Sequence, residues 1–288
     1  MNKIKILIEL TRLDKPIGFM LLFWPCLWGL ALASGQINEF DLFIKYIILF
    51  FLGSVLMRSA GCICNDIVDK DFDNKVKRTK NRPIPSGRIS VKESLFYLIL
   101  LCLISFTILI QFNFLTVALG LLSMPFAFLY PFMKRITYWP QLFLGLTFNW
   151  GILMAWTAVT GEISLEPIIL YFSAIFWTLG YDTIYGFQDI KDDEIIGVKS
   201  ASIKFKENYK IFIGLCYFIS VLFLITLGLL EENKMYYFIV LIFPVIHFFY
   251  QVNRLNKKDP AICLTIFKSN NFFGMLVFLT LMIPNIYS

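Results

Sequence analysis

Charged residues are scarce in this sequence, and histidine is almost absent. Only 16% of the 288 residues are Asp, Glu, Lys or Arg, one residue is histidine, and 58% are hydrophobic. The core of a water-soluble domain of this length would not bury so much apolar surface, which excludes an ordinary soluble protein. There is also no GxxxxGK[ST] loop, so nucleotide-driven transport has no support.

Cysteine and histidine give no sign of a zinc or redox site. The six cysteines lie in or beside apolar stretches, and Cys62 and Cys64 are two positions apart, which is not a usual zinc or redox spacing. We interpret the cysteines as small side chains that pack between helices. His247 lies in an apolar stretch without an acidic neighbour and is interpreted as structural.

Long apolar runs are what the sequence has in abundance. A run of about 17 residues or more is long enough to cross the hydrocarbon core of a bilayer as a helix. The sequence predicts an all-α integral membrane protein, one polytopic domain over residues 1–288. Its nine transmembrane helices are expected at 17–34, 42–64, 94–113, 115–132, 141–160, 167–185, 211–230, 235–252 and 271–287.

The first apolar run has an alternative interpretation as a secretory signal. Lys3 and Lys5 precede it, and a string of small residues follows at 31–35. However, Glu9 and Asp14 also precede it, and eight further apolar runs follow. We therefore expect a first transmembrane helix.

The placement of basic residues predicts the orientation. The net charge is +6. If the amino terminus is cytoplasmic, nearly every Lys and Arg falls on inside segments, and the outside connections carry little beyond Lys45 and Lys234. This pattern favours a lipid bilayer as the partner of the positive charge, and no nucleic acid is expected. The amino terminus and the acidic loops 65–92 and 186–208 are predicted to be cytoplasmic.

The first of these two loops carries a one-sided set of oxygen ligands. On a helix continued from the second span, Asn65, Asp66, Asp69 and Asp73 fall within an arc of about 100°. Asp71 points to nearly the opposite side by the same count and is interpreted as a solvated charge.

A second set follows the sixth span. Asp182, Tyr185, Asp189 and Asp193 fall within about 80° on the same construction, with Asp192 just off that face. Asp182 is expected inside the bilayer, where an ionisable group is costly and usually functional.

Each set alone could be a solvated helix end with mixed charges. Two sets on one side of the membrane, each beside Lys and Arg, indicate instead that a cation lies between the like charges. Oxygen ligands without His or Cys favour Mg²⁺, which is commonly held by carboxylates together with substrate phosphates. A diphosphate substrate is therefore expected. Its candidate contacts are Arg78, Arg82, Lys134 and Arg135. Lys75, Lys77 and Lys80 are interpreted as topology or lipid-contact residues.

These motifs resemble a known family. The string NDIVDKDFD at 65–73 and the string QDIKDD at 188–193 are similar to the two acidic motifs of UbiA-type membrane prenyltransferases. RLDKPIG at 12–18, KRTKNRPIPSG at 77–87 and YPFMKRITYWPQ at 130–141 resemble the 4-hydroxybenzoate polyprenyltransferase branch. The resemblance covers nearly the whole chain.

The resemblance implies a helical bundle around a central cavity, with both acidic motifs at its cytoplasmic end. It implies that Asn65, Asp69, Asp189 and Asp193 hold Mg²⁺, with Asp66 and Asp73 in support and Asp73 also a candidate ligand. The implied reaction joins the polyprenyl chain of polyprenyl diphosphate to the carbon ortho to the hydroxyl of 4-hydroxybenzoate, in ubiquinone biosynthesis at a bacterial inner membrane. No obligatory protein partner is evident.

Two roles stay open at the level of sequence. Arg12, Lys15 and Arg58 are unranked candidates for the acceptor carboxylate, and Asp182 or Tyr185 could steer the phenol or remove a proton. The alternatives are a menaquinone-type or haem O-type member of the same family, or an ion-coupled secondary transporter that binds its ion at Asp182 and the acidic helix ends. The Pro and Gly positions do not form the matching pair of broken helices that a transporter should show.

Overall fold

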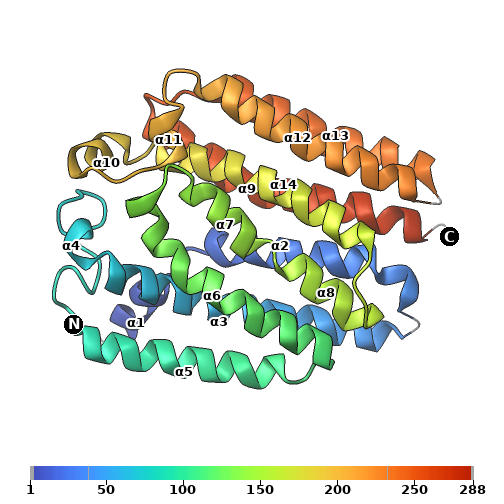
Figure 1. Cartoon of the computed structure of the whole chain (residues 1–288), viewed down its shortest axis with the longest axis horizontal. Coiled ribbons are helices and arrows are strands. Elements are labelled where there is room, and N and C mark those ends of the chain that lie inside the picture. The colour runs from blue at the N-terminus through green and yellow to red at the C-terminus, as the bar shows by residue number, and fades with distance from the viewer. Residues whose placement is uncertain (1–2, 38, 232, 287–288) are drawn as a thin grey trace.

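The computed structural model describes residues 3–37, 39–231 and 233–286. Within these ranges the regular secondary structure is entirely helical, which confirms the predicted all-α class. Figure 1 shows the long helices running side by side along one axis. The helices are α1 (Lys3–Thr11), α2 (Ile17–Leu32), η1 (Ser34–Gln36), α3 (Phe40–Val68), α4 (Lys70–Asp73), α5 (Val91–Leu109), α6 (Phe114–Ile136), α7 (Pro140–Phe148), α8 (Gly151–Thr160), α9 (Leu165–Gly186), α10 (Ile190–Ile196), α11 (Ala201–Lys204), α12 (Tyr209–Leu230), α13 (Lys234–Arg254) and α14 (Pro260–Ile286).

The expected count of nine membrane-spanning helices is not confirmed. Among the described residues, eight helical segments are long and apolar enough to cross a membrane. The remaining expected span, α2, has 16 residues and a length of about 24 Å, short of the roughly 30 Å hydrocarbon core. The last span begins at Pro260 instead of residue 271. Its expected end at Tyr287 lies outside the described residues.

One span is interrupted at its middle, where α7 ends at Phe148 and α8 begins at Gly151. The fully buried Asn149 satisfies the interruption, because its Nδ2 donates to the carbonyl oxygens of Gly145 at 2.8 Å and Ala174 at 3.1 Å and to Thr178 Oγ1 at 2.8 Å. Irregular backbone at membrane depth is tolerated only where protein groups satisfy it in this way.

Close helix packing forms the core. Gly29 lets α2 approach α8, since a Cβ there would lie 2.4 Å from the Ile152 carbonyl oxygen. Trp28 packs on Trp177 of α9 with ring centroids 4.8 Å apart, and its Nε1 donates to the Gly274 carbonyl oxygen of α14 at 2.8 Å. Helices from both halves of the chain therefore share one core.

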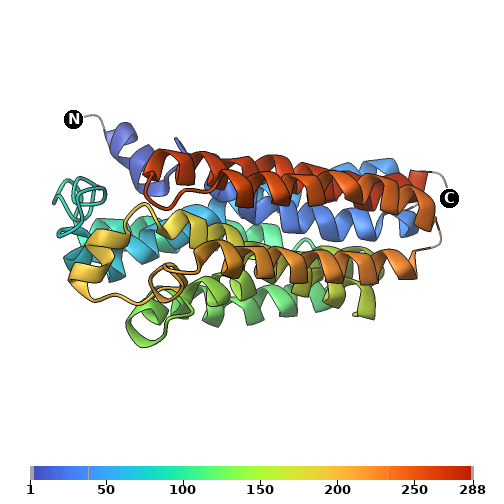
Figure 2. The same ribbon diagram turned by 90° about the horizontal axis from the view of Figure 1, so that it is seen from above.

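The short helices mark one end of the bundle. Figures 1 and 2 both show α1, α4 and α10 at the same end, while α14 finishes at the opposite end. The two acidic segments, 115 residues apart at Lys77 and Asp192, meet there through a hydrogen bond of 3.3 Å from the Lys77 backbone N–H to Asp192 Oδ2. Both acidic loops therefore lie at the same end of the bundle.

Candidate active site

A cavity of about 1490 Å³ opens beneath the acidic end of the bundle. It is larger than the roughly 300–1,000 Å³ of a typical small-molecule pocket. Its walls come from α2, α3, α5, α6, α7, α8, α9 and α14, so the bundle has a central cavity as expected. The predicted residues that line it are Arg12, Lys15, Arg58, Asn65, Asp69, Asp73, Arg78, Arg82, Lys134, Asp182, Tyr185, Asp189 and Asp193.

The first acidic motif is not one continuous helix. Helix α3 ends at Val68 and α4 begins at Lys70, so the backbone turns at Asp69. Asn65, Asp69 and Asp73 line the cavity, whereas Asp66 is buried behind it. Asp66 forms ion pairs with Arg12 and, at 3.0 Å, with Arg82. Arg82 also reaches Asp73 at 2.8 Å, and this Arg-rich packing fixes Asp66 and Asp73 relative to each other.

Asp69 is the most enclosed of the acidic residues, with a side chain that is 0% exposed. Its Oδ2 accepts a hydrogen bond from Lys134 Nζ, whereas its buried Oδ1 accepts none and has Arg135 Nη2 at 3.6 Å. Burial raises the pKa of Asp69 above its usual value, and Lys134 opposes that rise. The carboxylate therefore has one buried oxygen that accepts no hydrogen bond.

The second acidic motif is also split, since α9 ends at Gly186 and α10 begins at Ile190. Arg78 joins the two motifs: its Nε donates to Asp189 Oδ1 at 2.9 Å, its Nη2 to Oδ2 at 2.5 Å, and its Nη1 to the Tyr185 hydroxyl at 3.1 Å. Asp193 has no ion pair among the described residues. Burial, followed by the nearby Asp189, raises the pKa of Asp193 to about 6.

Like Asp66, the charged residues Asp71, Asp192 and Arg135 lie outside the cavity lining. Asp71 is exposed, and Asp192 accepts a hydrogen bond from the Lys77 backbone. Arg135, a predicted diphosphate contact, stacks on Phe72 with 4.9 Å from Cζ to the ring centroid and donates to the Val68 carbonyl oxygen at 2.7 Å. Its position supports the Asp69 turn instead of reaching the cavity.

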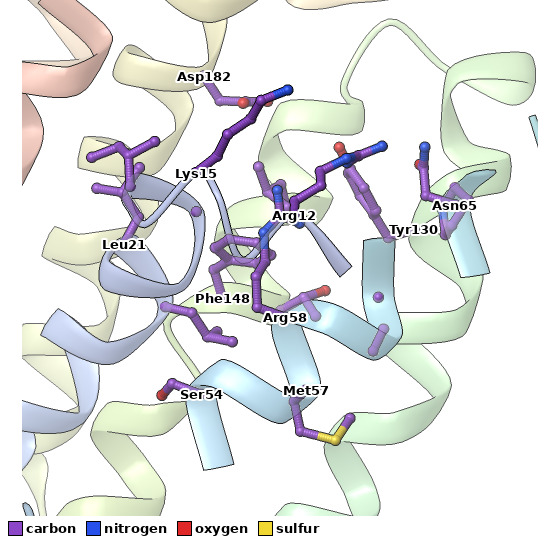
Figure 3. Close-up of a pocket in the computed structure, with 18 of the residues that line it drawn as sticks. Arg12, Lys15, Leu21, Ser54, Met57, Arg58, Asn65, Tyr130, Phe148 and Asp182 are labelled. Carbon is purple, nitrogen blue, oxygen red and sulfur yellow. The ribbon is translucent and has the colours of Figure 1, made fainter. Parts of the chain in front are cut away.

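The deeper part of the site contains Asp182 and Arg58. Figure 3 shows Arg12, Lys15, Arg58, Tyr130 and Asp182 around one pocket. Arg58 lies over the Phe148 ring, with 5.4 Å from Cζ to the centroid. Neither Arg58 nor Lys15 forms an ion pair with a described carboxylate, whereas Arg12 is engaged by Asp66.

Tyr130, Tyr181 and Lys268 are among the lining residues that sequence reasoning missed. The two tyrosines gave no signal of their own in the sequence. Lys268 did give one, because a lysine inside the apolar span 260–286 is costly unless it faces a cavity or a partner.

The oxygen donors suit a hard divalent cation that is shared with a substrate. Among the described residues, no group of three or more His, Cys, Asp or Glu side chains is arranged to hold a metal ion by itself. Mg²⁺ does not need such a group, because one or two carboxylates and substrate phosphates commonly complete its coordination. The unused Asp69 oxygen and the unpaired Asp193 fit this mode of binding.

Comparison with known sequences identifies the family. Residues 22–277 match the model of the UbiA prenyltransferase family. The chain belongs to this family. Family membership and eight helices that are long and apolar enough to cross a membrane together make this chain a multi-pass integral membrane protein.

The similar sequences and the similar solved structures point to the same family. The chain is 40% identical over 283 residues to the 4-hydroxybenzoate octaprenyltransferase of Vibrio parahaemolyticus, covering 98% of each chain. It is 42% identical over 273 residues to the mitochondrial 4-hydroxybenzoate polyprenyltransferase of Arabidopsis thaliana, covering 94% of this chain and 66% of that one. The fold is similar to that of a UbiA homologue from Archaeoglobus fulgidus bound to GPP and Mg²⁺, with a TM-score of 0.73, 17% identity and coverage of 96% and 99%.

Proposed function

We propose that this protein transfers a polyprenyl chain from polyprenyl diphosphate to the carbon ortho to the hydroxyl of 4-hydroxybenzoate, releasing diphosphate, as a step of ubiquinone biosynthesis. The observation that carries the proposal is the meeting of both acidic motifs, through Arg78 and Asp189, at the head of a long cavity. Relatives that cover nearly the whole chain and are named for this reaction support it.

The head of the cavity is the proposed diphosphate site. Asn65, Asp69, Asp73, Asp189 and Asp193 would hold Mg²⁺, which supplies positive charge to the leaving diphosphate when bound. The side chains of Arg78, Arg82 and Lys134 line the same space and carry phosphate-binding donors. The Arg78 side chain is 39% exposed and the Lys134 side chain is 27% exposed, so both can turn from a carboxylate to a phosphate oxygen.

The chemical step needs a dry cavity. The bond between the allylic carbon and the diphosphate oxygen breaks with both electrons going to oxygen, and a delocalised allylic cation remains. The walls around Arg58, Tyr130, Phe148 and Tyr185 exclude water and present aromatic faces, which stabilise a cation by about 0.5–2 kcal/mol each. The ring carbon of the acceptor then attacks, and the ring proton is lost.

Arg58 is the proposed partner of the acceptor carboxylate. Arg58 lines the cavity and lies seven residues before Asn65 on α3, which is about 10 Å along the helix. It has no described carboxylate partner, unlike Arg12, and it is fixed over Phe148 beneath the site. Lys15 lines the cavity but is exposed, so it is better placed to attract the anion than to orient it.

Asp182 is the proposed group that steers the phenol or accepts the proton. It shares the inner cavity with Arg58, whereas the Tyr185 hydroxyl already accepts a hydrogen bond from Arg78. We therefore place Asp182 before Tyr185 in this role.

The protein is proposed to lie in a bacterial inner membrane as one domain, with its amino terminus on the cytoplasmic side. The connections at the end opposite the acidic motifs, 33–39, 110–113, 161–164 and 231–233, contain no Lys or Arg, which supports this orientation. Reporter fusions after residues 36 and 74 should report opposite sides of the membrane.

The decisive experiment uses purified protein in liposomes with octaprenyl diphosphate. We expect transfer to 4-hydroxybenzoate that stops when EDTA is added and returns with Mg²⁺. Activity without any protein partner is also expected. Transfer to a dihydroxynaphthoate or to haem, with none to 4-hydroxybenzoate, would assign the chain to another branch of the family.

A further inference from the structure

Gly18, near the start of α2, leaves room for the Arg58 side chain of α3. A Cβ built on Gly18 would lie 2.9 Å from Arg58 Nε, and the next nearest atoms are Arg58 Nη2 at 3.5 Å and Cζ at 3.6 Å. Carbon atoms in contact normally lie about 3.5–4.0 Å apart. The guanidinium therefore occupies the space that a side chain at position 18 would need.

Neither the backbone nor helix packing explains the glycine at this position. Gly18 is the second residue of α2 and is not among the described residues with a positive φ, so an alanine would suit its backbone better. Gly29 of the same helix differs, because its built Cβ meets a backbone oxygen of α8. Among the glycines of the described residues, only Gly18 has a charged side chain as its nearest neighbour. Its small size therefore serves Arg58.

The Phe148 ring of α7 bounds the same guanidinium. Arg58 Cζ lies 5.4 Å from the ring centroid, and Figure 3 shows the two side chains next to each other in the pocket. Neither Gly18 nor Phe148 offers a carboxylate, and Arg58 forms no ion pair within the described part of the chain. A cation inside a membrane span is costly unless it faces a cavity or a partner. The charge of Arg58 therefore stays available to an anion in the cavity.

A guanidinium binds a carboxylate through N–H donors that are fixed in one plane. Such a pair depends on the position and the angle of the donors, so a small displacement weakens it. Arg58 and Gly18 both line the cavity, and so does Asp182, which belongs to α9 and has no contact with the Gly18 position in this arrangement. A change at Gly18 should therefore move one polar group of the acceptor site and leave the other in place.

We propose that Gly18 is a positioning residue that fixes the Arg58 guanidinium for an acceptor carboxylate, and that it thereby determines the preference for charged over uncharged para-substituted phenols. This inference rests on the proposed function, in which Arg58 binds that carboxylate. A methyl group at position 18 displaces the far end of the Arg58 side chain, because this end moves more easily than two packed helices do. The fold is kept and only the guanidinium shifts.

The first test compares kcat/KM for 4-hydroxybenzoate with kcat/KM for its methyl ester, which has the same phenol but no charge. We expect Gly18→Ala to lower the ratio of acid to ester about fivefold and Gly18→Val about twentyfold, as part or most of a charged hydrogen bond is lost. The value for the ester should stay within about twofold.

Gly214→Ala is the matched control, because Gly214 is also helical and has no atom within 4 Å of a built Cβ but does not line the cavity. Its ratio of acid to ester should equal that of the wild type. An unchanged ratio in both Gly18 variants overturns the proposal, and so does an equal fall for acid and ester, which a merely structural role would produce.

A second measurement does not depend on turnover. Radiolabelled 4-hydroxybenzoate is bound to the purified protein by equilibrium dialysis, with the methyl ester as competitor. Gly18→Ala should raise the Kd of the acid about fivefold and leave the Kd of the ester unchanged. Equal Kd values of the acid in wild type and Gly18→Ala overturn this inference alone. A wild-type protein that binds the acid without transferring a prenyl chain to it refutes the proposed function alone.

A double-mutant cycle identifies Arg58 as the residue through which Gly18 acts. In the Arg58→Leu background there is no guanidinium to displace, so adding Gly18→Ala should not change the Kd of the acid further. A further rise of the same size as in the wild-type background overturns the proposal.

Discussion

Asp69→Asn is the most informative single substitution, because it removes one charge from the centre of the site and leaves the size of the side chain unchanged. The Asp69 side chain is 0% exposed, receives Lys134 on one oxygen and has no hydrogen bond on the other. An amide oxygen can still contact a hard cation, but it is neutral and binds the cation more weakly than a carboxylate does. The prediction is a loss of activity with little loss of structure.

The expected loss of activity and the expected loss of stability can be estimated separately from the structure. Removing one preorganised group that stabilises developing charge costs about 3–4 kcal/mol, or roughly 10²–10³ in kcat. Breaking a fully buried ion pair costs about 3–5 kcal/mol of stability. Lys134 is 27% exposed and can turn to water, so we expect a stability loss at or below the low end of that range, about 1–2 kcal/mol.

The assay compares initial rates at several Mg²⁺ concentrations with thermal unfolding in the same detergent. Asp71→Asn is the matched control, since Asp71 is exposed and lies only two residues away. Asp71→Asn should keep wild-type activity within about twofold. The reasoning is refuted if both variants lose activity equally, or if Asp69→Asn loses only as much activity as it loses folded protein.

Three further predictions follow from single side chains. Arg58→Leu should raise the KM for 4-hydroxybenzoate about 10–100-fold with a smaller effect on the diphosphate, because a charged hydrogen bond of about 1.5–3 kcal/mol is lost; an equal rise for both substrates refutes it. Asp193→Asn should raise the Tm of the metal-free protein in EDTA at neutral pH while it lowers activity, because burial and Asp189 disfavour the Asp193 charge in the folded state; the gain is at most about 3 kcal/mol and smaller at this partly exposed position. Asn149→Leu should lower the free energy of unfolding by about 2–3 kcal/mol without a change in KM, because Gly145, Ala174 and Thr178 each lose a hydrogen bond from the Asn149 side chain. Unchanged stability in a denaturant titration contradicts this prediction.

The sequence was sufficient to predict the features that depend on local pattern. Apolar runs identified the spans, and helical periodicity grouped Asn65, Asp66, Asp69 and Asp73 on one side and Asp182, Tyr185, Asp189 and Asp193 on another. Asp66 does not line the cavity, whereas the other members of both groups do. The count of nine spans is not confirmed, because α2 has only 16 residues although its sequence is apolar throughout.

The features that depend on tertiary contacts were not predictable. The helix break after Val68 and the interruption at Asn149 have no proline at the break, and the Asn149 side chain is satisfied there by the Ala174 carbonyl oxygen of α9. Asp66 was expected to face the ligand with its neighbours. It turns instead to Arg12, a residue 54 positions away in sequence, and no periodicity in the chain encodes that pairing.

Those pairings bear on how the site can exist before substrate arrives. Four of the acidic residues, Asp66, Asp69, Asp73 and Asp189, are held by Arg and Lys side chains of the same chain. A buried carboxylate is strongly destabilising when unpaired, so these cations allow both motifs to fold around an empty cavity. When bound, a divalent ion would be held by Asp69 and Asp189, and the Lys134 and Arg78 side chains that these carboxylates release would face phosphate oxygens. Because each charge would change partner without being left alone, the carboxylates can be held in place before the substrate binds.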